Sequence, residues 1–132
     1  YFVGLAREAL GEREAAAAAF AKAAGYETGW SEQSFYQGLA ERKLGREAEA
    51  EKKFAGLAAF AADRLKTAPA MDFFEKFGER ETARRLSGQM HFLLGLARRG
   101  MGRADEAKAE FRKALEDNPN HVGAARELAG WR

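Results

Sequence analysis

The feature that most constrains this chain is a pattern of small and apolar residues that occurs three times. Each copy begins with Gly-Leu-Ala, at Gly4, Gly38 and Gly95. A second glycine, an alanine and a phenylalanine follow at the same intervals in every copy: Gly11, Ala16 and Phe20; Gly45, Ala50 and Phe54; Gly102, Ala107 and Phe111. The first two copies start 34 residues apart and the third starts 57 residues after the second. Recurrence at this length is typical of a helical repeat array.

Each copy predicts two helices joined by a tight turn. Residues that favour helices dominate the chain, proline occurs only twice, and valine and isoleucine are almost absent, so we expect an all-α fold. The second glycine of each copy ends the first helix, because glycine adopts the left-handed conformation at little cost. The first glycine lies mid-helix, where it costs about 1 kcal/mol relative to alanine. Its recurrence indicates that a partner helix approaches closely there, with the phenylalanine filling the gap.

This pattern resembles the tetratricopeptide repeat. The third copy is the best match, through Leu94-Gly95, Gly102, Ala107, Phe111, Ala114 and Pro119. The resemblance implies a right-handed superhelix of stacked antiparallel helical hairpins. Two departures mark the repeats as divergent. The first two copies lack the closing proline, and charged residues replace the aromatic that the family has three residues after the mid-helix glycine: Arg7, Glu41 and Arg98.

We predict a single domain, 1–132, with repeat units at about 1–25, 32–66 and 88–117. A helical insertion, 69–87, separates the second and third units. Thr67-Ala68-Pro69 should end the preceding helix, and Asp72 should begin a short helix that Gly78 breaks. A further stretch then runs to Leu86-Ser87-Gly88. The three phenylalanines of this insertion either pack against neighbouring helices or form a patch for a partner: Phe73, Phe74 and Phe77.

The segment 120–131 should form a C-terminal capping helix after Asn118-Pro119-Asn120. Its inner side is predicted to carry Val122, Ala125, Leu128 and Ala129. It is either a cap on the stack or the first helix of a fourth unit.

The insertion prompts a narrower comparison. Two hairpins, an aromatic spacer and a histidine-containing helix that leads into a third hairpin look like the C-terminal tail of a bacterial group. In that group a galactose-mutarotase-like region precedes helical repeats. The residues that carry this resemblance are Met71-Asp72-Phe73-Phe74, His91 and the run from Leu94 to Gly102. It implies an accessory or oligomerisation tail of a larger carbohydrate-active protein. Because the chain opens at Tyr1 without methionine, we expect a fragment of a longer protein.

The composition argues against several other functions. With 22 basic and 20 acidic residues the net charge is only +2, so we expect no nucleic-acid partner. There is no cysteine and no apolar run of the roughly 20 residues that span a bilayer. We therefore expect a cytoplasmic protein with no membrane partner, no cofactor, no metal and no catalytic residue. His91 is predicted to be a structural helix residue with one ring nitrogen bonded nearby, and His121 an exposed residue at a helix start; a ligand or base role is the alternative for each.

The predicted function is a scaffold that binds a protein or peptide, with homo-oligomerisation possible. By the resemblance, the first helix of each hairpin lines a concave groove, on which Tyr1 and Leu5 also lie. The predicted partner-binding residues are Phe35, Leu39, Arg42, Lys43, Phe92, Leu96 and Arg99. Apolar anchors beside basic residues suit a peptide with an acidic end. The alternative is that a short array fills this groove with its own side chains. In the loop before the second copy, Tyr26 and Trp30 either plug the hairpin junction or contact a ligand.

Overall fold

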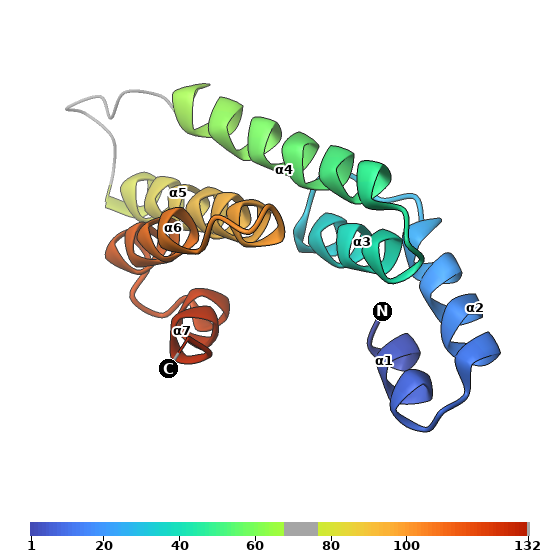
Figure 1. Cartoon of the computed structure of the whole chain (residues 1–132). Helices are drawn as coiled ribbons and strands as arrows, with labels where there is room; N and C mark the ends of the chain where they lie inside the picture. Colours follow the sequence, from blue (N-terminus) through green and yellow to red (C-terminus); the bar gives the residue numbers. More distant parts are fainter. Residues whose placement is uncertain (68–76, 132) are drawn as a thin grey trace. The chain divides into compact units, whose positions relative to one another are not determined.

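Figure 1 shows the computed structural model, which describes residues 1–67 and 77–131 and contains, in those ranges, seven helices and no strand. The helices are α1 (Phe2–Ala9), α2 (Arg13–Ala24), α3 (Glu32–Lys43), α4 (Glu47–Thr67), α5 (Phe77–Gly100), α6 (Ala104–Asp117) and α7 (Val122–Ala129). The predicted all-α class is confirmed.

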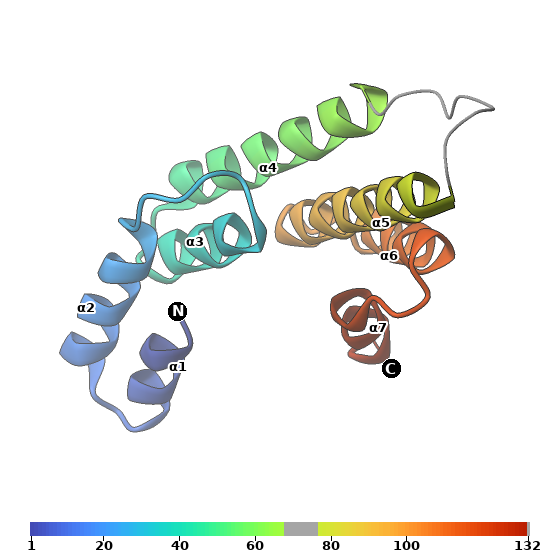
Figure 2. The same ribbon diagram turned by 180° about the vertical axis from the view of Figure 1, so that it is seen from behind.

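The helices belong to two compact units, an N-terminal unit, Tyr1–Leu57, and a C-terminal unit, Ala58–Arg132. In the first, α1 pairs with α2, and α3 pairs with the first part of α4. In the second, α5 and α6 lie side by side and α7 packs against α6 (Figure 1, Figure 2). The proposed grouping into three repeat units and a cap stays a prediction.

The three hairpin turns have one geometry. Gly11, Gly45 and Gly102 have φ of 77°, 76° and 76°, and among the described residues only these three have positive φ. In the first turn, the amide of Gly11 donates to the carbonyl of Glu8 (3.0 Å) and the amide of Glu12 to that of Arg7 (2.9 Å). The other two turns repeat both bonds with the same lengths. This is the Schellman arrangement, which requires a left-handed residue just past the helix end, so the predicted role of these glycines is confirmed.

The mid-helix glycines each lie directly beneath a phenylalanine ring of the following helix. A Cβ added at Gly95 would come within 2.5 Å of Phe111 Cε1, and Gly38 faces Phe54 in the same way. Phe54 and Phe111 are completely buried, and the corresponding Phe20 is 3% exposed. The close approach predicted from the repeated glycines is therefore confirmed.

Each unit has a core of alanines and large apolar side chains. The buried apolar residues of the N-terminal unit are Ala16, Phe20, Ala24, Phe35, Ala40, Ala50, Phe54 and Leu57. Those of the C-terminal unit are Ala61, Met90, Phe92, Leu93, Leu94, Leu96, Ala97, Ala107, Phe111, Ala114 and Ala124. Alanine at the contact positions allows the helix backbones to come close enough for the phenylalanines to span the gap.

The helix break predicted at Gly78 and the end predicted near Gly88 are wrong, because α5 runs without interruption from Phe77 to Gly100. Gly88 is a second point of close approach. A Cβ there would lie 3.1 Å from the carbonyl oxygen of Ala114 and 3.1 Å from the Cβ of Asn118. The expectations for Ala68, Pro69 and the run Met71-Asp72-Phe73-Phe74 lie outside the described residues.

The predicted inner face of the capping helix is also wrong in part. Val122 is 70% exposed and Ala125 and Ala129 are also exposed, whereas Leu128 is partly buried and Ala124 is completely buried. The orientation is fixed at the start of α7, where the Nδ1 atom of His121 accepts a hydrogen bond from the amide of Ala124 (3.2 Å). The Nε2 atom lies 2.9 Å from Oε1 of Gln89 on α5. His121 is therefore a partly buried capping residue and not an exposed one.

We predict that Gly95→Ala destabilises the protein. Alanine normally favours a helix over glycine, but here its methyl group overlaps the ring of Phe111. Overpacking of this kind costs about 1–3 kcal/mol. The matched control is Gly78→Ala on the same helix, where a Cβ has nothing within 4 Å. Thermal unfolding followed by circular dichroism should show a lower Tm for Gly95→Ala and an unchanged or higher Tm for Gly78→Ala. Equal Tm values for the two variants would contradict the close-contact role.

Candidate protein-binding surface

The predicted groove residues of the N-terminal unit divide into buried and ion-paired side chains. Phe35 is only 3% exposed and Leu39 is partly buried. Arg42 makes hydrogen bonds to both carboxylate oxygens of Glu47 (2.7–3.0 Å). Lys43 contacts Glu8 of α1 through Nζ and Oε2 (2.6 Å).

The predicted groove residues of the C-terminal unit show the same division. Phe92 and Leu96 are 3% and 1% exposed. A Cβ at Gly123 of α7 would meet the Phe92 ring at 2.7 Å, so α7 covers Phe92 directly. Arg99 forms an ion pair with Glu127 of α7. In this unit the chain's own C-terminal helix lies on the predicted partner-binding residues.

Ion pairing favours the charged forms of Arg42 and Glu47. The hydrogen bond to Glu47 raises the pKa of Arg42, and the same bond lowers the pKa of Glu47. The Arg42 guanidinium also lies over the Phe54 ring, 5.0 Å from its centroid. The Arg42 guanidinium is thus already paired within the hairpin, so a peptide carboxylate would have to compete with Glu47 for Arg42.

The N-terminal unit contains an open aromatic hollow that the sequence did not single out. Its volume is about 750 Å³. It is lined by Tyr1, Phe2, Val3, Ala19, Lys22, Ala23, Tyr26, Thr28, Gln33, Tyr36 and Gln37. Phe2 and Tyr26 are 64% and 67% exposed. The rings are contiguous, since Phe2 lies 5.0 Å and Tyr1 5.8 Å from the centroid of Tyr36. This aromatic hollow has the size of a ligand pocket and the side chains of an interface.

The spacing of two aromatic residues in the sequence could have pointed to the aromatic hollow. Phe2 and Tyr36 are 34 residues apart and so occupy one position in successive copies. The third copy has Leu93 there, which is only 2% exposed. The loop residues Tyr26 and Trp30 have different surroundings. Tyr26 lines the aromatic hollow, whereas Trp30 lies against Gly56 of α4.

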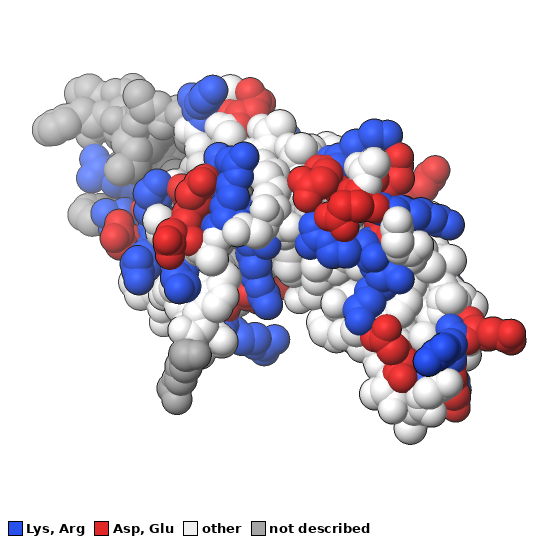
Figure 3. All heavy atoms as spheres, viewed as in Figure 1, with Lys and Arg blue, Asp and Glu red and all other residues white. Residues whose placement is uncertain are grey.

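Charge is mixed over the surface. On the face that Figure 3 shows, lysine and arginine side chains lie beside aspartates and glutamates and form no broad basic area. The aromatic hollow carries one charged lining residue, Lys22. Its lining is therefore mainly apolar, with one cationic side chain.

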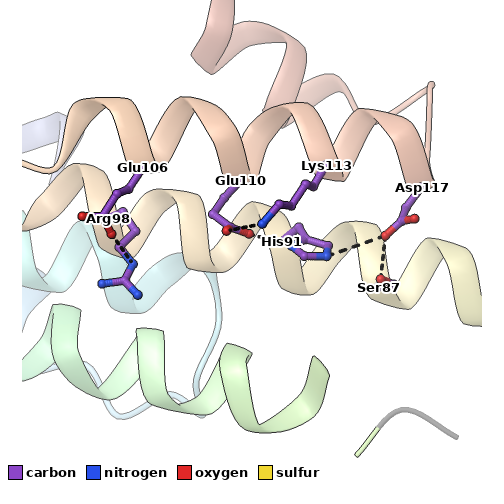
Figure 4. Close-up of polar contacts among 7 residues, drawn as sticks. All are labelled: Ser87, His91, Arg98, Glu106, Glu110, Lys113 and Asp117. Atoms are coloured by element: carbon purple, nitrogen blue, oxygen red, sulfur yellow. Dashed lines mark hydrogen bonds and ion pairs between the residues drawn. The ribbon is translucent and has the colours of Figure 1, made fainter. Parts of the chain in front are cut away.

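A network of polar side chains joins α5 to α6 (Figure 4). Nδ1 of His91 lies 2.6 Å from Oε2 of Glu110, and Nζ of Lys113 donates to Oε1 of the same carboxylate (2.9 Å). On the other side of the ring, Nε2 of His91 is 3.9 Å from Oδ2 of Asp117. Ser87 donates a hydrogen bond to that same carboxylate oxygen (2.6 Å). The predicted hydrogen-bonded structural role of His91 is confirmed.

The geometry of this network differs from that of a catalytic Ser-His-Asp triad. The Ser87 hydroxyl donates to Asp117, so His91 is not placed to take its proton, as a Ser-His catalytic pair requires. Within 1–67 and 77–131 no group of three or more His, Asp or Glu side chains could hold a metal ion. In the same ranges, no helix combines the length and the apolar character needed to cross a lipid bilayer.

Comparison with known protein families finds a match for one hairpin of the chain. Residues 89–121, which run from within α5 to the start of α7, match the family model described as tetratricopeptide repeat. This segment is a tetratricopeptide repeat. Tetratricopeptide repeats commonly mediate protein–protein interaction and the family is generally a non-catalytic scaffold.

The other comparisons add no relative. No curated protein and no solved structure matches the chain. The matched tetratricopeptide repeat supports neither the galactose-mutarotase-like region nor the bacterial origin that the narrower resemblance implied.

The structure shows what the charged residues do at the three positions where the resemblance would place an aromatic. Each replacing charge forms an ion pair across its own turn. Arg7 contacts Glu12 (2.5 Å), and Glu41 contacts Arg46 (3.3 Å). In the tetratricopeptide repeat, Arg98 contacts Glu106 on the first turn of α6 (3.4 Å). An aliphatic stem and an ion pair thus take the place of a ring.

The Glu110 carboxylate predicts a pH dependence for the tetratricopeptide repeat. Its burial opposes ionisation, but hydrogen bonds from Lys113 and His91 outweigh burial and lower the pKa of Glu110 below 4.5. A lowered pKa in the folded state stabilises the fold above the ordinary glutamate pKa, and this stabilisation is lost as the pH falls through the folded-state value. We expect the free energy of unfolding of the wild type to decrease below about pH 4.5 and that of Glu110→Gln to change less over this range.

At pH 7, Glu110→Gln should lower the free energy of unfolding by about 1–3 kcal/mol, because charged hydrogen bonds are lost at a largely buried position. Urea titrations at several pH values measure both effects. Glu81→Gln is the control, since its pair with Arg85 is exposed and should matter little. Parallel pH profiles for the wild type and Glu110→Gln would show that Glu110 is not the source of the pH dependence.

Proposed function

We propose that this chain is a protein-interaction scaffold and that a polypeptide binds at the aromatic hollow of the N-terminal unit. The supporting observation is the exposure of contiguous rings around an open volume of about 750 Å³. Exposed apolar patches with a polar rim are a common mark of interaction sites. The tetratricopeptide repeat at residues 89–121 supports the same class of function.

In this proposal the aromatic hollow, and not the predicted groove, is the primary binding site. Phe35, Phe92 and Leu96 are buried, so a ligand would reach them only by taking the place of the part of the chain that covers them. Phe2 and Tyr26 are already exposed, so a ligand covers them without unfolding anything. The basic groove residues Arg42 and Lys43 remain candidates for secondary contacts with an acidic part of the ligand.

The ligand that fits best is a short polypeptide segment with one or two large apolar side chains. Tyrosine and phenylalanine offer wide, rigid contact surfaces with little loss of conformational entropy on binding. Lys22, at the hollow, favours a carboxylate next to the apolar anchor.

The test is selection of displayed random peptides on the whole chain, followed by affinity measurement with one selected synthetic peptide. We expect Phe2→Ala and Tyr26→Ala to raise the Kd tenfold or more, which is about 1.4 kcal/mol for each variant. Leu10→Ala is the matched control, because Leu10 is 72% exposed and lies outside the aromatic hollow. Circular dichroism checks that all variants remain helical. If no peptide is selected, or if all three variants bind equally, the proposal fails.

A further inference from the structure

The contacts of α7 define a second surface in the C-terminal unit. Three residues at intervals of four, Gly123, Glu127 and Trp131, each meet a different feature of the third hairpin. Gly123 lies on the Phe92 ring, and Glu127 pairs with Arg99. The Trp131 ring lies 5.9 Å from that of Phe111. Gly123 and Glu127 share one face of α7, and Trp131, which follows the helix end, brings its ring onto the same hairpin.

The hairpin surface beneath α7 has the complementary chemistry. Phe92 and Phe111 supply apolar rings, and two cations flank the tryptophan. The Arg99 guanidinium carbon is 5.8 Å and Lys108 Nζ is 5.1 Å from the centroid of Trp131. Arg99 thus serves both the carboxylate of Glu127 and the ring of Trp131, which is a combination that arginine's flat guanidinium allows.

The α7 helix has little stability of its own. It has eight residues, and helices of that length are unstable on their own in water. Ala124 is its one completely buried residue. Its glycine further weakens the helix. A partner helix that presents the same face with better helix-forming residues would bind the same surface at a lower folding cost.

We propose that the surface formed by Phe92, Arg99, Lys108 and Phe111 is a helix-binding site that α7 occupies in the isolated chain. Its partner is an amphipathic helix with glycine or alanine, a glutamate four residues later and an aromatic residue just past the helix end. Such a helix displaces α7, so α7 acts as an internal competitor that sets the affinity. This site is separate from the aromatic hollow and does not depend on it.

The test uses the full chain with α7 loosened. Gly123→Ala adds a methyl group 2.7 Å from the Phe92 ring and leaves the surface beneath α7 unaltered. Since the chain contains no cysteine, Val122→Cys in either background gives one site for a nitroxide label at a position that is 70% exposed. The line shape of the label reports whether α7 is docked. The probe is a synthetic peptide with the sequence of residues 121–131, and the control peptide carries lysine in place of Glu127.

We expect the glutamate peptide to bind the Gly123→Ala chain at least tenfold more tightly than the wild type, because tethered α7 competes at an effective concentration on the order of millimolar. The label should become more mobile as the peptide binds. The lysine peptide should bind at least tenfold more weakly. With Arg99→Glu added to the Gly123→Ala chain, the preference between the peptides should reverse, and circular dichroism checks that this chain remains helical.

Three results would overturn the proposal. The first is a mobile label in the Gly123→Ala chain without peptide binding, and the second is binding that leaves the label unchanged. The third is a dimer in light scattering that peptide does not dissociate, which would assign the surface to the α7 of a second copy. Phe2→Ala in the same chain should leave peptide binding unchanged, which separates this site from the aromatic hollow.

Discussion

The contact between a glycine backbone and a phenylalanine ring sets the geometry of every hairpin in this protein. At Gly38 and Gly95 the first helix has no side chain, and the ring of Phe54 or Phe111 occupies the space that a Cβ would fill. The second helix can therefore lie close to the first, with Ala50 and Ala107 buried at the contact. Because these interfaces have little unfilled volume, they respond to the addition of one methyl group. The left-handed turn glycines then fix where the second helix begins.

Features that depend on local spacing could be predicted from the sequence. The turn glycines and the Gly–Phe pairs recur at fixed intervals, and each interval has one simple interpretation in a helical hairpin. The continuity of α5 could not be predicted in this way, because Gly88 looks the same in a sequence whether it ends a helix or permits close approach. Only the position of Ala114 and Asn118 distinguishes the two.

The candidate site shows the same limit more sharply. The seven-residue spacing predicts that Phe35 lies on one helix face with Arg42, and Phe92 with Arg99, but it carries no information about what covers that face. The cover of Phe92 is α7, whose orientation follows from the hydrogen bonds of His121 to Ala124 and Gln89. Conversely, the sequence left open whether Tyr26 plugs the hairpin junction or contacts a ligand and gave no prediction for Phe2, and both side chains are exposed in the fold. Equivalent positions of the repeated pattern thus differ in exposure, as Phe2 and the buried Leu93 show.

The ion pairs across the first two turns have opposite polarity, with Arg7 facing Glu12 in one hairpin and Glu41 facing Arg46 in the other. Exposed pairs of this kind add little stability, but like charges placed together are unfavourable. If the α1 segment paired with the α4 segment, Arg7 would face Arg46, and if α3 paired with α2, Glu41 would face Glu12. Near-identical helices connected in series risk such mispairing while they fold. The reversed polarity therefore disfavours an exchange of helices between the first two hairpins.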